Sequence, residues 1–228
     1  MNLEPADQAY LDGNIEYFSQ VRREIFPFLP EKMGRVLEVG CGTGDTLSYI
    51  RQRNRCDWAG GIELVSSAAA IARGKVDLLI EGDIEAMELP FEEGSLDVIL
   101  CLDILEHLVD PWRVVQKLDK LLKPGGVLIA SIPNVRHCRL VFPLLFQGKW
   151  QYRDSGILDK THLRFFVRES AIELMGSSGL KVEKVRITGL DRGSKGWIAN
   201  LLTLGLFQSF FERQFLICAR KSPAGQPS

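Results

Sequence analysis

The sequence lacks the cysteine and histidine patterns that hold small extracellular or zinc-binding domains together. Its five cysteines are an odd number, no Cys-x-x-Cys pair occurs, and their spacing is scattered: Cys41, Cys56, Cys101, Cys138 and Cys218. The three histidines are His107, His137 and His162, and no close pair among them has metal-ligand spacing. We therefore expect neither a disulfide framework nor a metal site.

Long apolar runs and an excess of one charge are also missing. No stretch approaches the roughly 18 apolar residues of a membrane span, and the first ten residues carry Glu4 and Asp7 where a secretory signal needs an apolar segment. Lys and Arg number 28 against 29 Asp and Glu, so the formal net charge is -1. Since non-specific nucleic-acid binding needs a basic face, we expect a cytoplasmic protein without a nucleic-acid partner.

Short apolar runs alternate with segments of helical periodicity. Strands are predicted over residues 35–39, 58–64, 76–80, 96–101 and 127–132, and again over 181–187 and 214–219. Helices are predicted over 45–53, 66–73 with Ser66 as cap, from Asp110 to the Pro124-Gly-Gly126 turn, and over 169–178. This rhythm predicts an α/β fold with a doubly wound, mostly parallel sheet.

One domain is expected over residues 1–221, because no linker or repeat interrupts the pattern. Within it we expect a helical N-terminal cover over 1–33 and an aromatic-rich insertion over 133–168 on the acceptor side. Residues 222–228 are expected to be a disordered tail.

A glycine-rich loop follows the first predicted strand, in the run Glu38-Val-Gly-Cys-Gly-Thr-Gly44. Glycine lets the backbone turn sharply and approach a ligand closely. The third glycine comes one residue earlier than in the dinucleotide fingerprint, and Asp45 occupies its place. About 20 residues on, Glu63 ends the second strand, where a carboxylate can accept from both ribose hydroxyls. NAD and S-adenosylmethionine sites both use that device, and a tight turn followed by a solvated Glu is the plain alternative.

The run from 35 to 132 resembles the class I S-adenosylmethionine-dependent methyltransferases. Seven motifs appear in the order of that family: Leu37-Glu-Val-Gly-Cys-Gly-Thr-Gly44, Gly61-Ile-Glu63, Gly82-Asp-Ile84, Leu89-Pro-Phe91, Phe91-Glu-Glu-Gly-Ser-Leu-Asp97, Glu106-His-Leu108 and Leu122-Lys-Pro-Gly-Gly126. The resemblance implies a Rossmann-like sheet of seven strands whose last strand is antiparallel. It also implies S-adenosyl-L-methionine as the cofactor.

The resemblance further implies roles for individual residues. Glu38 would act through the glycine loop, Glu63 would hold the ribose, and Asp83 would accept from the adenine amino group. The remaining cofactor-binding residues that it implies are Gly40, Cys41, Gly42, Thr43, Gly44, Leu64, Ile84, Leu102, Asp103 and His107. Taken alone, Asp83 after Gly82 would be an ordinary turn residue.

The insertion carries the candidates for the acceptor side. Thr161, His162 and Arg164 offer a hydroxyl, a base and a cation in one segment, although a β-like segment with a polar outer face is an alternative. We expect His162 to position or deprotonate the acceptor, with Asp103 and Asp159 as competing bases. For His107, pocket wall and catalysis are equally expected.

The acceptor is expected to be the O or N atom of a small polar metabolite. The insertion resembles a bacterial branch of the family encoded with sugar and polysaccharide genes, which suggests a sugar or a lipid-linked sugar. Apolar residues at 140–146 and 197–211 fit a lid, a dimer surface, a contact with a lipid-linked acceptor or ordinary packing, so either a monomer or a homodimer is expected. A nucleotide-dependent oxidoreductase or epimerase, and a non-catalytic S-adenosylmethionine-binding protein, are the alternatives.

Overall fold

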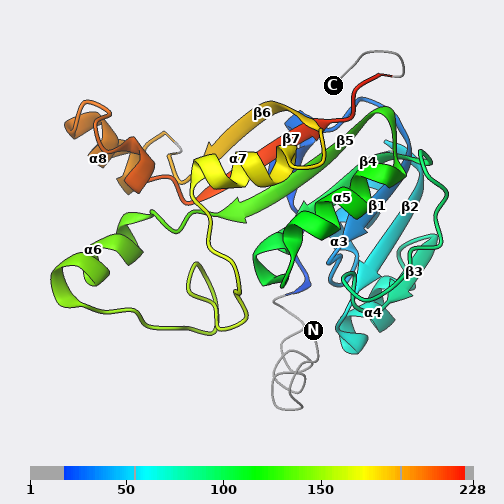
Figure 1. Ribbon diagram of the computed structural model, residues 1–228, viewed down its shortest axis with the longest axis horizontal. Helices are drawn as coiled ribbons and strands as arrows, with labels where there is room; N and C mark the ends of the chain where they lie inside the picture. Colours follow the sequence, from blue (N-terminus) through cyan, green and yellow to red (C-terminus); the bar gives the residue numbers. More distant parts are fainter. Residues whose placement is uncertain (1–17, 54, 191, 224–228) are drawn as a thin grey trace.

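The computed structural model describes residues 18–53, 55–190 and 192–223, and a single sheet runs through them (Figure 1). Its strands are β1 (Met33–Val39), β2 (Cys56–Glu63), β3 (Leu78–Glu81), β4 (Leu96–Leu102), β5 (Leu122–Pro133), β6 (Lys181–Thr188) and β7 (Gln214–Arg220). Over the described residues the order is β3-β2-β1-β4-β5-β7-β6. Only β7 pairs antiparallel, with β5 and with β6. The prediction of a mostly parallel seven-stranded sheet with an antiparallel last strand is confirmed.

Helices connect the strands and cover both faces of the sheet. They are η1 (Arg23–Phe28), α3 (Asp45–Gln52), α4 (Ser66–Ala72), η2 (Leu105–His107), α5 (Pro111–Leu121), α6 (Cys138–Gln147), α7 (Arg168–Gly176), α8 (Lys195–Leu202) and η3 (Gln208–Phe210). The start of α5 is as the sequence predicts: Asp110 accepts from the Arg113 N–H at 3.0 Å, and Pro111 takes the first position, which needs no amide donor.

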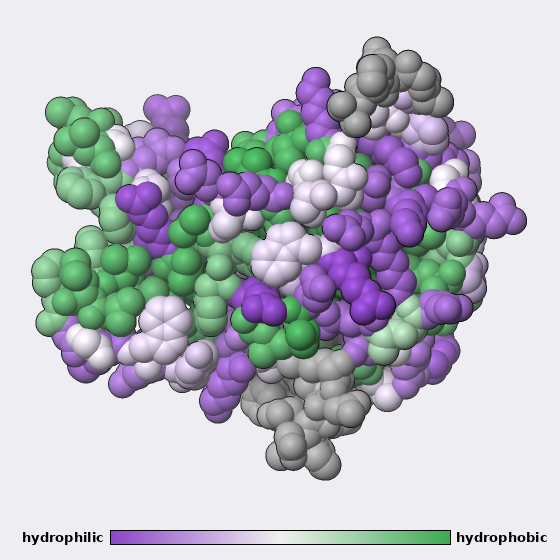
Figure 2. All heavy atoms as spheres, viewed as in Figure 1, coloured by the Kyte–Doolittle hydropathy of each residue, from purple (hydrophilic) through white to green (hydrophobic). Residues whose placement is uncertain are grey.

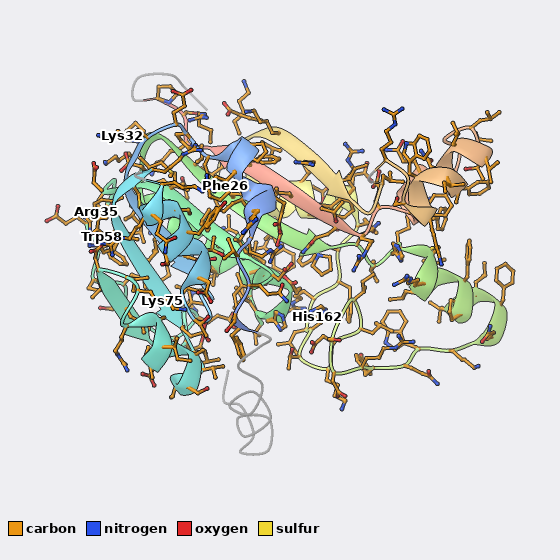
Figure 3. The ribbon with its side chains drawn as sticks, turned by 180° about the vertical axis from the view of Figure 1, so that it is seen from behind. Phe26, Lys32, Arg35, Trp58, Lys75 and His162 are labelled. Atoms are coloured by element: carbon orange, nitrogen blue, oxygen red, sulfur yellow. The ribbon has the colours of Figure 1, made fainter. Side chains whose placement is uncertain are left out.

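Two apolar layers lie on opposite faces of the sheet. Successive side chains of a strand point to opposite faces, so Leu37 packs in the layer of α5 and α7, whereas Val36 packs in the layer of η1 and α3. Figure 1 shows α5 and α7 in front of the sheet, and Figure 3, seen from behind, shows Phe26 of η1 on the other side. The carboxyl ends of the parallel strands therefore lie between two helical layers.

Ser66 begins α4 but does not cap it, contrary to the sequence prediction. The cap position is Val65, which makes no side-chain cap hydrogen bond. The Ser66 hydroxyl instead donates to Glu81 Oε1 at 2.5 Å. A charged acceptor on the neighbouring strand forms the stronger hydrogen bond, so it takes the hydroxyl from the helix end.

Several strand boundaries differ from the prediction by one or two residues, and the start of the fifth strand differs by five. The third strand begins at Leu78 rather than 76, because the Val76 N–H still donates to Ala72 O at the end of α4. The fifth strand begins at Leu122 rather than 127, because Leu122 already pairs with Leu96 of β4. The Pro-Gly-Gly turn therefore lies within β5, and α5 ends ahead of it.

Two apolar lobes stand away from the sheet: the α6 lobe (residues 138–147) and the α8 lobe (residues 195–207) (Figure 1). The α6 lobe contacts η3, which follows the α8 lobe, because Phe142 and Phe210 stack with centroids 6.1 Å apart. Asn134, which precedes α6, donates to the carbonyls of Ser209 and Glu212. Figure 2 shows apolar residues gathered on both lobes. Among the described helices, none has the length and apolar character needed to cross a bilayer.

Candidate cofactor and acceptor site

A pocket of about 310 Å³ opens at the carboxyl ends of β1, β2, β3 and β4. Its wall is completed by Phe18, Gln20 and Arg22 from the segment before β1, and by residues of the 154–161 loop. In open α/β sheets this edge, where the strand order reverses, is the usual ligand site. The pocket therefore lies where the sequence motifs place the cofactor.

The glycine loop needs its glycines for two separate reasons. Gly40 and Gly42 have φ angles of 70° and 54°, a region that residues with a Cβ rarely adopt. A Cβ on Gly42 would also lie 2.6 Å from the carbonyl oxygen of Phe18. That carbonyl accepts from the Thr43 N–H at 3.2 Å, so the N-terminal segment is fastened directly onto the loop.

Glu63 ends β2 with its carboxylate held by backbone amides. Oε2 accepts from the Gly42 N–H at 2.7 Å and Oε1 from the Val65 N–H at 2.9 Å. The side chain is buried, and burial raises the pKa of its carboxyl above the usual range, against these hydrogen bonds. Glu63 thus joins the glycine loop to β2 and presents a fixed acceptor to the pocket.

Glu38 is a buried acid at the floor of the pocket. It is 3% exposed, and among the described residues its Oε2 has no hydrogen-bond partner. Burial raises the pKa of this carboxyl to about 8, although the Arg22 guanidinium acts in the opposite direction. Glu38 is therefore protonated in the ligand-free protein at neutral pH, and a cationic ligand group beside it would favour the ionised form.

The charge of the pocket favours a cationic ligand over a dinucleotide. Seven of the described lining residues are acidic: Glu38, Glu63, Asp83, Glu85, Asp103, Asp154 and Asp159. At the N-terminal end of α3, where dinucleotide folds bind pyrophosphate, Asp45 is held by Lys75 at 2.6 Å and by the Thr43 hydroxyl at 2.6 Å. A carboxylate already occupies the place of a phosphate. These carboxylate acceptors therefore fit a ligand with positive charge, ribose hydroxyls and an amino group, as S-adenosylmethionine has.

Asp83 and Ile84 follow β3 and line the pocket. Asp83 Oδ1 accepts from the Glu85 N–H at 2.9 Å, which is the turn geometry typical of Asp. Ile84 is buried and faces the pocket as an apolar wall. A planar base between this wall and a carboxylate is a reasonable fit, and the adenine assignment stays a prediction.

Asp103 is fixed by donors from distant parts of the chain. Its Oδ1 accepts from the Ser131 hydroxyl at 2.9 Å and from the Gln214 amide, and Oδ2 accepts from Arg22. Its φ of 57° lies in the left-handed region, which Asp tolerates better than most residues. With both oxygens engaged, Asp103 is better suited to organising the pocket than to accepting a proton.

His107 lines the pocket beside Asp159 and Thr161. Its Nδ1 lies 2.9 Å from the Thr161 hydroxyl, which in turn donates to Asp159 Oδ1 at 2.7 Å. Burial lowers the pKa of His107 to about 4, and the neighbouring His162 acts in the same direction. His107 is therefore a neutral imidazole at neutral pH.

His162 lies behind His107 and is not among the described residues that line the pocket. It is buried, its Nδ1 lies 3.0 Å from the Ile157 carbonyl, and its ring stands edge-on to His107 with centroids 4.6 Å apart. Burial lowers its pKa as well. Figure 3 shows it where the insertion meets the sheet. Direct contact with an acceptor would require this wall to move, so the expected role of His162 stays a prediction.

The structure brings most of the predicted site residues together around one pocket. Besides His162, only Thr43 and Gly44 of the predicted set are not among its described lining residues; Gly44 caps α3 in the left-handed conformation. Sequence reasoning named Thr161 as the hydroxyl of the acceptor-side segment but did not foresee its contact with His107, and it gave Arg22 no role in the site. Arg22 stands 81 positions before Asp103, its partner, and no local pattern marks it. The expected cover residues 1–17 and tail residues 224–228 lie outside the described residues.

A second pocket of about 460 Å³ lies between α6 and the 149–158 loop. Its described lining includes four permanent cations and no acid; the cations are Arg139, Lys149, Arg153 and Arg213. The surrounding lobes expose large apolar side chains, with Phe146 74% and Leu202 79% exposed. A basic hollow flanked by apolar lobes fits an amphiphile that carries negative charge.

The comparisons with known proteins agree on one family. The family model described as "Methyltransferase domain" matches residues 10–185. A curated relative, the ubiquinone biosynthesis O-methyltransferase of Xylella fastidiosa, is 32% identical over 166 residues, which are 67% of this chain and 66% of the relative. The enzyme of the same name from Acinetobacter baylyi is 27% identical over 161 residues, 64% of this chain and 66% of the relative. The chain thus spans about two thirds of the length of these relatives.

Solved structures share the fold at low sequence identity. An S-adenosylmethionine-dependent methyltransferase from Mesorhizobium loti is 18% identical with a TM-score of 0.61, covering 92% of this chain and 100% of that one. One from Archaeoglobus fulgidus is 18% identical with a TM-score of 0.60, covering 94% and 92%. The [4+2]-cyclase SpnF is 20% identical with a TM-score of 0.58, covering 96% and 83%. The fold therefore accommodates more than one chemistry.

Proposed function

The chain belongs to the methyltransferase-domain family and its cofactor is S-adenosylmethionine, and from this premise we propose that it is an O-methyltransferase for a hydroxyl group on an amphiphilic acceptor. The observation that carries the proposal is the acidic pocket at the carboxyl edge of the sheet. The oxidoreductase alternative loses support, because Asp45 puts a carboxylate in the first turn of α3, the helix end at which dinucleotide folds bind pyrophosphate. The alternative is a protein that binds S-adenosylmethionine without catalysis, and a measurement of methyl transfer decides between the two.

Different residues of the pocket would contact different parts of the cofactor. Glu63 would accept from the ribose hydroxyls, and Asp83 from the adenine amino group. The unpartnered oxygen of Glu38 would face the positive end of the molecule, close to the glycine loop. When bound, S-adenosylmethionine supplies an electrophilic methyl group on a sulfonium.

The acceptor hydroxyl would lie at the side of the pocket formed by Asp103, His107 and Asp159. In the proposed transfer an O–C bond would form as the S–C bond breaks, sulfur would keep the electron pair, and the hydroxyl proton would leave to solvent. Holding the two reacting atoms in line and excluding water supplies much of the rate. The fixed network around Asp103 supports this positioning.

The class of acceptor is inferred from the insertion and from the relatives. The curated relatives are named for O-methylation in ubiquinone biosynthesis, and the small polar sugar expected from the sequence finds no support among them. The exposed α6 and α8 lobes would contact the apolar part of the acceptor or a lipid surface. The basic pocket between α6 and the 149–158 loop would bind a negatively charged group. We therefore assign an amphiphilic, lipid-linked hydroxyl compound.

Calorimetric titration tests the cofactor assignment. We expect S-adenosylmethionine and S-adenosylhomocysteine to bind in the micromolar range and NAD not to bind. Glu63→Gln should weaken binding by about tenfold or more, because it replaces a charged acceptor, whereas the same change at the exposed Glu92 should have no effect. Binding of NAD in place of the sulfur nucleosides would overturn the assignment.

Vesicle co-sedimentation tests the acceptor surface. We expect the chain to bind vesicles that contain phosphatidylglycerol more strongly than pure phosphatidylcholine vesicles. The double change Leu145→Ser and Leu202→Ser, one residue from each lobe, should abolish binding, and Leu78→Ser, an exposed apolar residue of β3, should not. Equal binding by all three proteins would refute a role for the lobes.

A further inference from the structure

Glu106, His107 and His162 place one carboxylate oxygen and two ring nitrogens within 4.8 Å of one another. The sequence predicted no metal site, because only two of these residues are neighbours in the chain and the third follows 55 positions after His107. We propose that the three side chains bind a divalent transition-metal ion, of which Zn²⁺ is the natural example.

Hydrogen bonds fix the hydrogen on each imidazole. The Ile157 carbonyl can only accept, so His162 Nδ1, at 3.0 Å, carries the hydrogen. The Thr161 hydroxyl donates its hydrogen to Asp159, so it accepts from His107 Nδ1 at 2.9 Å. Both rings therefore keep a free electron pair on Nε2. Histidine ligands of metals show a similar arrangement, with the second ring nitrogen donating to a carbonyl, a carboxylate or a water molecule.

With Glu106 ionised, the cluster brings three acceptors together without a donor. Glu106 is 1% exposed, and among the described residues its Oε2 has no hydrogen-bond partner. Its Oε1 lies 3.9 Å from His162 Nε2, too far for a hydrogen bond. A proton on Glu106 could serve one imidazole and would leave the other without a donor. One cation between the three groups satisfies all of them.

The ligand set matches known metal chemistry. Two histidines and one carboxylate bind catalytic zinc or ferrous iron and leave coordination positions open. Ligands at about 2.0–2.2 Å from one ion lie roughly 3–3.5 Å from each other, so the cluster would contract by about 1 Å around the ion. The side chains are reachable from the pocket, because His107 forms part of its wall.

A role of the ion in catalysis rests on the proposed function. An acceptor hydroxyl bound to it would lose its proton to solvent more readily and would be held beside His107. Metal binding itself does not depend on that role, and it can be measured without cofactor or acceptor. Failure of the metal site and failure of the methyltransferase proposal are therefore separate outcomes.

The test is metal analysis of the full-length chain without a histidine tag, after EDTA treatment and titration with Zn²⁺ or with Co²⁺ as a visible-absorption probe. We expect one ion per chain. His162→Gln and Glu106→Gln should weaken binding about 100-fold or more, and Thr161→Val, which removes the partner of His107, by about 10- to 100-fold. His137→Gln, the remaining histidine, should bind as the wild type does.

Thermal unfolding with and without Zn²⁺ keeps the test valid if a variant folds poorly. We expect Zn²⁺ to raise the melting temperature of the wild type and of His137→Gln, and to have a smaller effect on Thr161→Val, which keeps all three ligands. Wild-type protein that binds no ion, or variants that bind it as tightly as the wild type, would overturn the proposal.

Discussion

Replacing Glu38 with glutamine should remove part of the pH dependence of stability. Glu38 is 3% exposed at the floor of the cofactor pocket, and burial raises the pKa of its carboxyl from 4.5 to about 8. The folded state therefore binds a proton that the unfolded state has released between those pH values. The contribution is fully present below about pH 4.5 and is lost as pH rises through about 8.

The magnitude follows from this pKa shift. While Glu38 is protonated in the folded state and ionised in the unfolded state, unfolding free energy falls by about 1.4 kcal/mol for each pH unit. Between pH 5.5 and 7.5 the loss is roughly 2–3 kcal/mol. Glutamine resembles the neutral acid and does not titrate, so the variant should lose less stability over the same interval.

Urea unfolding of the cofactor-free protein across this pH interval measures the effect. Burial also raises the pKa of Glu63 and Glu106, so both proteins will lose stability, and the difference between them reports Glu38. Glu92→Gln, the same change at an exposed position, should follow the wild type. Parallel curves for the wild type and Glu38→Gln would show that Glu38 is ionised in the folded state, and would refute the reasoning.

Three other substitutions test separate parts of the site and fold. Gly42→Ala should cost about 1–3 kcal/mol of stability in urea unfolding, because its φ is 54° and its Cβ would meet the Phe18 carbonyl; an unchanged midpoint would contradict this geometry. Asp83→Ala should weaken S-adenosylmethionine binding about 10- to 100-fold in calorimetry, and unchanged affinity would remove Asp83 from the site. Asp110→Ala should lower stability by about 1 kcal/mol, because it removes the side-chain cap of α5. A thermal melt would detect this loss, and the substitution should leave cofactor affinity unchanged.

The sequence by itself determined the order of strands and helices and the position of the cofactor loop. Both depend on local properties: apolar runs of strand length, helical spacing, and glycines that permit left-handed backbone. The parallel sheet follows because helices separate the strands, and parallel strands bring their carboxyl ends to one edge. This is why residues that follow the strands were expected at one edge of the sheet, whereas the roles of Glu38 and Asp83 came from the resemblance to the methyltransferase family.

The tertiary structure decided which side chains meet across the site. Arg22 reaches Asp103 from 81 residues away, and Thr161 reaches His107 from 54 residues away. We expected His162 on the acceptor surface. In the structure it is buried behind His107, with its Nε2 3.9 Å from Glu106 Oε1. The local sequence pattern does not predict these contacts, because they depend on how the insertion packs against η2. That packing results from many weak contacts between residues that are distant in the sequence.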